Sequence, residues 1–372
     1  MTKISNREKL ISALKCEKNG FVPISPLGMN RFEWTNNFPS YKKVIAAVTE
    51  YGTPIVKIPF DSAHFLADTN VTQPKTEVKT EGDVDTIKMT LQTPKGELYS
   101  LSKRNRKVAG GSAALKFLIE NDSDIEKMMS LYSCKTALPD LTSGLAKMKE
   151  VGDEGLTCFN GIKSPFAVVA DYFKYEFFLE WAFSNPEMLR EIVELYFKRN
   201  QELITYLIDS GAGPVFRWYN IEGYTTPMMP PSFADEFIVP YDTKLMKMVK
   251  DAGGFIDNHC HGQLKDQARN FVKMGVDCIN CVEPPPANDI NLRDLRKATD
   301  GKICFWGYIQ WDDMERKTTE EIRALTREAI DMSGGYGFIL SQAASAYASE
   351  ISEKFSENML AMIDEGRRFN AL

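Results

Sequence analysis

The stretch Met248–Pro284, "MVKDAGGFIDNHCHGQLKDQARNFVKMGVDCINCVEP", contains a clear alternation of predicted strand and helix. Short runs rich in β-branched and aromatic residues at 254–259 and 276–282 predict two strands. Between them, apolar residues recur at helical spacing and predict a helix at 263–274. A strand, a helix and a second strand in this order form a unit that is typical of a parallel sheet.

The same alternation continues along the rest of the 372 residues. Six further strands are predicted, at 22–25, 54–58, 156–160, 214–219, 302–307 and 337–341. Further helices are predicted at 41–51, 140–151, 186–210, 232–252, 318–333 and 350–366. Eight strands separated by helical segments favour an α/β fold of the (β/α)8 TIM-barrel type over an open sheet.

One interval, residues 69–135, interrupts this rhythm. The stretch 87–105, "IKMTLQTPKGELYSLSKRN", predicts a β-hairpin whose turn is Thr93–Gly96. We interpret the interval as an insertion that decorates the barrel, so a single domain is expected over residues 1–372.

The amino-acid composition limits which kinds of partner this protein is expected to have. Hydrophobic content of 43% and charged content of 26% indicate a globular protein, and the formal net charge is −6. The densest basic run, Lys103–Lys107, is too short for a phosphate-binding stripe, so nucleic acid is not expected as a partner. The amphipathic N-terminus and the lack of long apolar runs predict a cytoplasmic protein without a membrane segment. Seven cysteines, an odd number in a large chain, predict reduced thiols.

In a barrel of this type the active site lies at the carboxyl ends of the strands, so the residues that follow each predicted strand are the candidates. The candidate site residues are Arg31, Arg217, Tyr219, Glu222, His259, His261, Glu283, Tyr308, Trp311 and Gln342.

Two of the three histidines lie in "DNHCHGQ" (257–263). Side chains alternate along a strand, so His259 and His261 point the same way and Cys260 points to the other side. A His-x-His pair needs further ligands, and the carboxylates expected to reach the same space are Glu222, Glu283 and Asp257. With an open position, such a zinc site would be of the catalytic type. The alternative is one hydrogen-bonded and one exposed histidine.

Cys278 and Cys281 form a Cys-x-x-Cys spacing that we interpret as buried thiols. Strand alternation predicts that the two side chains face opposite sides of the sheet. Because Cys281 shares its predicted face with Glu283, it remains a minor ligand candidate. His64 is predicted to be a structural loop residue.

Several motifs, in their order, resemble the uroporphyrinogen decarboxylase superfamily. They are "NREKLISALKCEKNGFVPISP", "SFADEFIVPYDTKLMKMVKDAGGFIDNHCHG", "MGVDCINCVEPP", "GKICFWGYIQ" and "GYGFILSQAASAYASEISEKFSENMLAMIDEGRR". The resemblance covers about residues 5–366 and is weakest at 69–135. It implies a (β/α)8 barrel and, since members are often dimers, a homodimer. True decarboxylases of this superfamily carry an arginine-rich N-terminal signature, whereas "PLGMNRFEW" here holds Arg31 alone.

The cobalamin-linked methyltransferase branch is the closer match. Members that methylate coenzyme M hold zinc with His-x-Cys after strand 5 and a cysteine after strand 8. Here the first pattern is His259-x-His261, and Gln342 lies near the second position. Nitrogen and carboxylate ligands leave zinc a harder Lewis acid, which suits an ether oxygen as leaving group.

The resemblance therefore implies a corrinoid-dependent methyltransferase, such as the component of an O-demethylase. Its methyl donor would be a methoxylated or methylated small molecule, and a partner protein would carry the corrinoid (cobalamin). Zinc would be held by His259 and His261, with Glu222 or Glu283 as third ligand or as general acid. Arg217, Tyr219, Tyr308, Trp311 and Gln342 would line the substrate pocket.

Two alternatives come from other functional classes. One is a decarboxylase of a smaller carboxylic acid, with Arg31 and Arg217 gripping carboxylates. The other is a non-catalytic binder of a tetrapyrrole or corrinoid.

Overall fold

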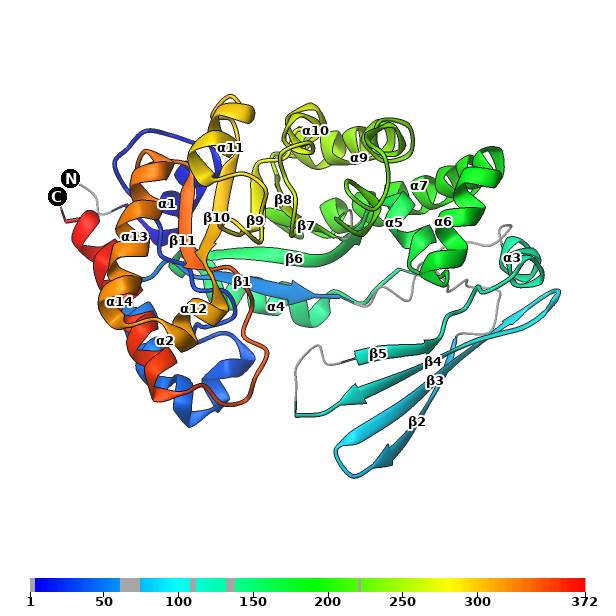
Figure 1. The fold of residues 1–372 in the computed structure, drawn as a ribbon, viewed down its shortest axis with the longest axis horizontal. Coiled ribbons are helices and arrows are strands. Elements are labelled where there is room, and N and C mark those ends of the chain that lie inside the picture. The colour runs from blue at the N-terminus through cyan, green and yellow to red at the C-terminus, as the bar shows by residue number, and fades with distance from the viewer. Residues whose placement is uncertain (1–3, 61–73, 108–111, 132–137, 220–221, 372) are drawn as a thin grey trace.

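The computed structural model describes residues 4–60, 74–107, 112–131, 138–219 and 222–371. At its centre is a curled parallel sheet in the order β1-β6-β7-β8-β9-β10-β11, flanked by helices (Figure 1). Each of these strands coincides with one predicted from the sequence, which confirms the barrel-type α/β fold. Their bounds are β1 Ile55–Pro59, β6 Leu156–Lys163, β7 Val215–Tyr219, β8 Phe255–His259, β9 Cys278–Val282, β10 Cys304–Ile309 and β11 Phe338–Gln342.

The remaining predicted strand, 22–25, is present only as a single parallel bridge between Ile24 and Leu340 of β11. On its other side, the backbone N–H of Thr53 donates to the carbonyl of Ile24 at 2.8 Å, just before β1 begins. The segment therefore lies between β11 and β1 and occupies the eighth position of the barrel. It forms no regular strand there, because Pro23 has no N–H to give to a ladder.

Helices cover the outside of the sheet, and local sequence sets their ends. The helix α13 begins with a capping box of Thr318 and Glu321 and ends at Gly334 in the left-handed conformation. No helix in the described ranges is long and apolar enough to cross a membrane. The α-helices are α1 Asn6–Leu14, α2 Lys42–Tyr51, α3 Asp122–Met129, α4 Thr142–Val151, α5 Pro165–Ala170, α6 Tyr175–Ser184, α7 Pro186–Asp209, α8 Pro231–Phe233, α9 Val239–Asp251, α10 Ala268–Met274, α11 Leu292–Ala298, α12 Trp311–Arg316, α13 Thr319–Ser333 and α14 Glu353–Phe369. The shorter turns are η1 Trp34–Asn37, η2 Pro39–Tyr41, η4 Gly152–Glu154, η5 Glu222–Tyr224 and the π-helical η6 Ala234–Ile238.

The predicted insertion is an antiparallel sheet in the order β2-β3-β4-β5, which projects to one side of the barrel (Figure 1). Thr93 and Gly96 pair across the predicted turn, so the hairpin is confirmed. Two more strands extend it, and β4 contacts α3. The strands are β2 Lys75–Glu81, β3 Val84–Thr93, β4 Gly96–Asn105 and β5 Ser112–Lys116.

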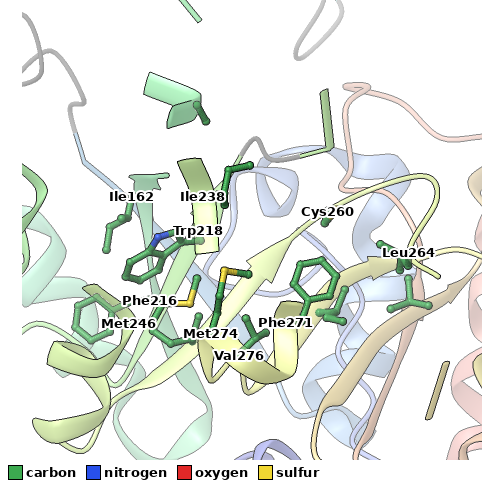
Figure 2. Packing of buried hydrophobic residues seen from close by; sticks show 14 of the residues in the cluster. Ile162, Phe216, Trp218, Ile238, Met246, Cys260, Leu264, Phe271, Met274 and Val276 are labelled. Carbon is green, nitrogen blue, oxygen red and sulfur yellow. The ribbon is translucent and has the colours of Figure 1, made fainter. Parts of the chain in front are cut away.

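Side-chain alternation along the parallel strands creates two hydrophobic clusters. Residues such as Ile55, Leu156 and Val215 form a cluster inside the barrel. Phe216, Trp218 and many others pack between the sheet and the helices (Figure 2). Burying each large apolar side chain contributes roughly 1.5–3 kcal/mol relative to leaving it exposed. The inward positions nearer the carboxyl ends of the strands are polar, and they make the candidate site.

Candidate metal centre

His259 and His261 lie at the carboxyl end of β8, as predicted. His259 is the last residue of the strand, and the two imidazole rings are 4.8 Å apart with an interplanar angle of 86°. Between them, Cys260 is buried in the cluster that lies between sheet and helices. Strand alternation therefore placed these three side chains correctly.

Cys281 on β9 faces inward with the histidines, in agreement with its prediction as a minor ligand candidate on the face of Glu283. Asn280 pairs with Trp306 and Val282 pairs with Gly307, so Cys281 is an extra residue in the register with β10. Such a bulge interrupts side-chain alternation. Cys278 and Cys281 consequently both belong to the cluster inside the barrel, and the expectation that they face opposite sides is wrong.

His259, His261 and Cys281 together form a group that could hold a metal ion. One potential ligand atom from each residue lies within 4.8 Å of the other two. Two imidazole nitrogens, one sulfur and an open fourth position match the ligand number and type of catalytic zinc sites. The site thus contains a thiolate candidate, supplied by β9 and not by the positions that the cysteine-ligated relatives use.

Each histidine has a partner for the ring nitrogen that would not bind the metal. Nδ1 of His259 lies 3.2 Å from Oδ1 of Asn280, and Nδ1 of His261 lies 3.1 Å from Oε2 of Glu283. Both partners accept hydrogen bonds, which assigns an N–H to Nδ1 and makes Nε2 the atom that would bind a metal in each ring. Metal-binding histidines are usually oriented in this way.

Glu283 is itself held in place. Its Oε1 accepts a hydrogen bond from Nε2 of Gln310 at 3.3 Å, and its Oε2 accepts one from the backbone N–H of Gly262 at 3.4 Å. Burial tends to raise the pKa of Glu283, but its bond with His261 and these two hydrogen bonds outweigh that effect and lower the pKa. Glu283 is therefore an anion that orients His261.

The two histidines differ in protonation. Burial, together with the charges of Arg217 and His261, lowers the pKa of His259 to about 3. Contact with Cys281 and the bond with Glu283 raise the pKa of His261 to about 10. At neutral pH and without metal, the His259 imidazole is neutral and can bind a metal directly. The His261 imidazole is protonated, so it must lose a proton before its Nε2 can bind a cation.

Glu222 was the other predicted carboxylate ligand. It begins η5, after β7, and is not in the group of three ligand candidates. Burial, followed by the charges of Glu222 and Glu283, raises the pKa of the Cys260 thiol, so both carboxylates lie near this segment. A role for Glu222 as ligand or acid stays a prediction.

Two of the predicted pocket residues, Tyr219 and Arg217, lie close to the histidines. The Tyr219 ring is 5.1 Å from the His259 ring, and its hydroxyl hydrogen-bonds to Oδ1 of Asn160. Arg217 is 1% exposed, and its Nε and Nη2 lie 2.6 and 2.5 Å from Oδ2 of Asp257. Arg217 is thus part of the barrel interior, and its guanidinium is already paired with a carboxylate.

The structure does not bring Arg31 or Gln342 to the histidines. Arg31 forms a two-point ion pair with Glu154 of η4, which precedes β6 and so lies at the opposite end of that strand. Gln342 is fully buried; its amide donates to the carbonyl of Leu27 at 2.8 Å and accepts from the backbone N–H of Leu27 at 3.3 Å. Gln342 therefore helps to tie the chain after residue 25 to β11.

The predicted pocket residues Tyr308 and Trp311 also lie elsewhere. Tyr308 lines a cavity of about 340 Å³ with Pro284, Pro285 and residues of α13, and neither histidine lines this cavity. The Trp311 ring packs against Tyr347 and Phe355 at 4.5 and 4.3 Å. His64 lies outside the described residues.

Sequence reasoning missed Lys57 and Glu33. Lys57 lies on β1, its backbone N–H donates to Oε1 of Glu33 at 3.0 Å, and its Nζ donates to Oγ of Ser345. Burial, then the charge of Arg217, lowers the pKa of Lys57, and burial raises that of Glu33. The sequence does contain a signal for Lys57: it is the single charged residue in the apolar strand "PIVKI", at an inward position of a predicted barrel strand.

Comparisons with known proteins identify a family and structures with a similar fold. The uroporphyrinogen decarboxylase (URO-D) family model matches residues 109–365. A methyltransferase from Methanosarcina mazei is similar in structure, with a TM-score of 0.61, 12% identity, and coverage of 98% of this chain and 99% of that one. A B12-independent methionine synthase from a Shewanella species gives a TM-score of 0.45 at 10% identity over 63% of this chain and 67% of that one, too little to support an inference. Among curated proteins, no sequence match was found. Because the family model spans well over half of the chain, this protein belongs to the uroporphyrinogen decarboxylase family.

Proposed function

We propose that this protein is a methyltransferase that moves a methyl group from a methoxylated or methylated small molecule to a corrinoid carried by a partner protein. The observation that carries the proposal is the group of His259, His261 and Cys281, whose ligand atoms lie within 4.8 Å of one another. The similarity in fold to a methyltransferase over nearly the full length of both chains supports the same reaction class.

The donor set fits zinc, and it defines the chemistry that zinc would supply. Two neutral imidazoles and one thiolate leave Zn²⁺ with a net charge of +1, so a bound ion would act as a Lewis acid on the heteroatom that carries the methyl group. The thiolate makes this site softer than the nitrogen and carboxylate set expected from the sequence. Even with the thiolate, a bound zinc ion would still favour a donor whose leaving group becomes an anion.

The residues of this chain then have distinct roles. Asn280 and Glu283 hold the two imidazoles by their Nδ1 atoms. Tyr219 packs beside His259 and forms one wall for the donor. In the overall reaction with a methyl ether, the ether bond would break, the methyl group would pass to the reduced corrinoid of the partner protein, and the alkoxide or phenoxide would take up one proton. Glu222 is the candidate for delivering that proton, because Glu283 is held as an anion by His261.

The decarboxylase alternative receives less support from the same residues. Its two proposed carboxylate grips, Arg31 and Arg217, already hold the protein's own Glu154 and Asp257. Nothing in the described residues favours a non-catalytic tetrapyrrole binder. A homodimer remains a prediction from the family resemblance.

Metal analysis and a methyl-transfer assay test the proposal together. Protein purified without added zinc is compared with its His259→Ala/His261→Ala variant by plasma mass spectrometry, and each is then assayed with cob(I)alamin and a panel of methoxylated and methylated donors. We expect zinc and methyl transfer in the wild type and neither in the variant. Equal metal content in the two proteins, or no transfer from any donor, would refute the proposal.

A further inference from the structure

Lys57 is a largely buried basic residue on the inner wall of the barrel, and the proposed methyl transfer gives it no role. Ile55, two residues earlier on β1, belongs to the cluster inside the barrel, so alternation directs Lys57 inward as well. Its Nζ donates to Oγ of Ser345, which follows β11 in the chain. The Lys57 ammonium group therefore reaches the segment that follows the carboxyl end of β11, on the same side of the barrel as the metal centre.

This ammonium group has no carboxylate at ion-pair distance among the residues that the structure describes. Asp257 is taken by Arg217 through two close contacts. Glu33 uses Oε1 to accept the backbone N–H of Lys57, not its Nζ. An ammonium has three donor hydrogens, and Ser345 accounts for one of them. Burial lowers the pKa of Lys57, and the nearby charge of Glu33 offsets this only in part. An anion bound from outside the protein would therefore stabilise the charged form of Lys57.

The position of Lys57 relative to the metal centre suggests what that anion is. Arg217 on β7 and Cys281 on β9 are close enough to Lys57 to interact with its charge. In the strand order β1-β6-β7-β8-β9, the strands of Lys57 and Cys281 face each other across the barrel. A small molecule with an acidic group at one end and a methyl-bearing group at the other could reach both.

We propose that Lys57 and Ser345 bind a carboxylate of the methyl donor, so that the substrate is a methoxylated carboxylic acid. Nζ of Lys57 donates to one carboxylate oxygen, and the Ser345 hydroxyl, which accepts from Lys57, donates its own hydrogen to the other. The methyl-transfer part of this statement rests on the proposed function, whereas carboxylate binding at Lys57 does not.

Binding is measured by calorimetry, without cobalamin, so that it is independent of turnover. The probes are three carboxylates, acetate, 4-methoxybenzoate and 3,4-dimethoxybenzoate, each compared with its neutral amide. We expect the wild type to prefer at least one acid over its amide by roughly tenfold or more, as for a charge-assisted hydrogen bond. Lys57→Met should abolish this preference while melting temperature and zinc content stay unchanged.

Two further variants sharpen the test. Lys43→Met removes an exposed lysine that pairs with Glu353, and it should keep the full preference. Glu33→Gln keeps an acceptor for the Lys57 N–H but removes a nearby negative charge, so it should strengthen carboxylate binding. This second variant tests the proposal even if Lys57→Met fails to fold.

The outcomes separate this inference from the proposed function. Equal affinity for every acid and its amide, or an unchanged preference in Lys57→Met, overturns carboxylate binding at Lys57 even if methyl transfer is found. A preference lost in Lys57→Met, in a protein that transfers no methyl group to cob(I)alamin, supports the binding site and refutes the methyltransferase.

Discussion

Replacing Asp257 with asparagine is expected to destabilise the protein strongly, because the buried guanidinium of Arg217 would lose its counter-charge. The two residues are each 1% exposed, and Nε and Nη2 of Arg217 lie 2.6 and 2.5 Å from Oδ2 of Asp257. Removing one partner of such a pair costs about 3–5 kcal/mol. For 372 residues, an unfolding entropy of about 2.1 cal/mol/K per residue converts this cost to a fall in Tm of about 4–6 °C.

Differential scanning calorimetry measures this change, and Arg31→Met is the matched control. Arg31 also forms a two-point ion pair, with Glu154, but the two side chains are 41% and 57% exposed. Exposed pairs contribute about 0–1 kcal/mol, so the control should shift Tm by no more than about 1 °C. Arg217→Met/Asp257→Leu, which removes both charges, should recover most of the loss. If Asp257→Asn behaves like the control, Arg217 is not a buried structural cation and the account of the barrel interior is wrong.

Three further predictions concern the metal centre. Asn280→Leu should weaken zinc binding about 10–100-fold, measured by competition with a chromophoric chelator, because His259 loses the acceptor that orients it; an unchanged affinity would exclude that role. Zinc affinity should rise at least about tenfold per pH unit from pH 7 to 9, because His261, whose pKa is about 10, must release a proton when zinc binds. A zinc affinity that does not change with pH would contradict the raised pKa of His261. With cobalt(II) in place of zinc, the sulfur-to-metal charge-transfer absorption should vanish in Cys281→Ser and persist in Cys260→Ser, because only Cys281 belongs to the ligand group; the reverse pattern would assign the wrong sulfur.

The barrel could be predicted from sequence because its signal is local. Each parallel strand is a short apolar run between helical periodicities, and every strand of the curled sheet was located in this way. The segment 22–25 occupies its predicted place but forms only one bridge, since Pro23 cannot donate to a neighbour. The strands β2 and β5 of the insertion were not predicted individually, because their largely exposed residues show no apolar face.

The site was predictable only as far as regular alternation holds. It placed His259, His261 and Cys260 correctly and put Cys281 on the face of Glu283, but it failed for Cys278 relative to Cys281, because an extra residue in the register with β10 puts both side chains inside the barrel. A bulge is a property of two paired strands, so one strand's sequence does not reveal it.

Pairings between distant residues were likewise beyond sequence reasoning. Arg31 and Arg217 look alike as candidate carboxylate grips, yet one pairs with Glu154 at the surface and the other with Asp257 inside the barrel. Only the fold shows which carboxylate each guanidinium meets.

X-ray absorption at the zinc edge reports the atoms bound to the metal, so it shows whether His259, His261 and Cys281 hold zinc. For zinc-loaded wild-type protein we expect one sulfur at about 2.3 Å and two imidazole nitrogens at about 2.0–2.1 Å, with a further light atom in the open position. Cys281→Ser should lose the sulfur shell and keep the imidazole signals. A wild-type spectrum without sulfur, or with two or more sulfurs, would contradict a centre built from His259, His261 and Cys281.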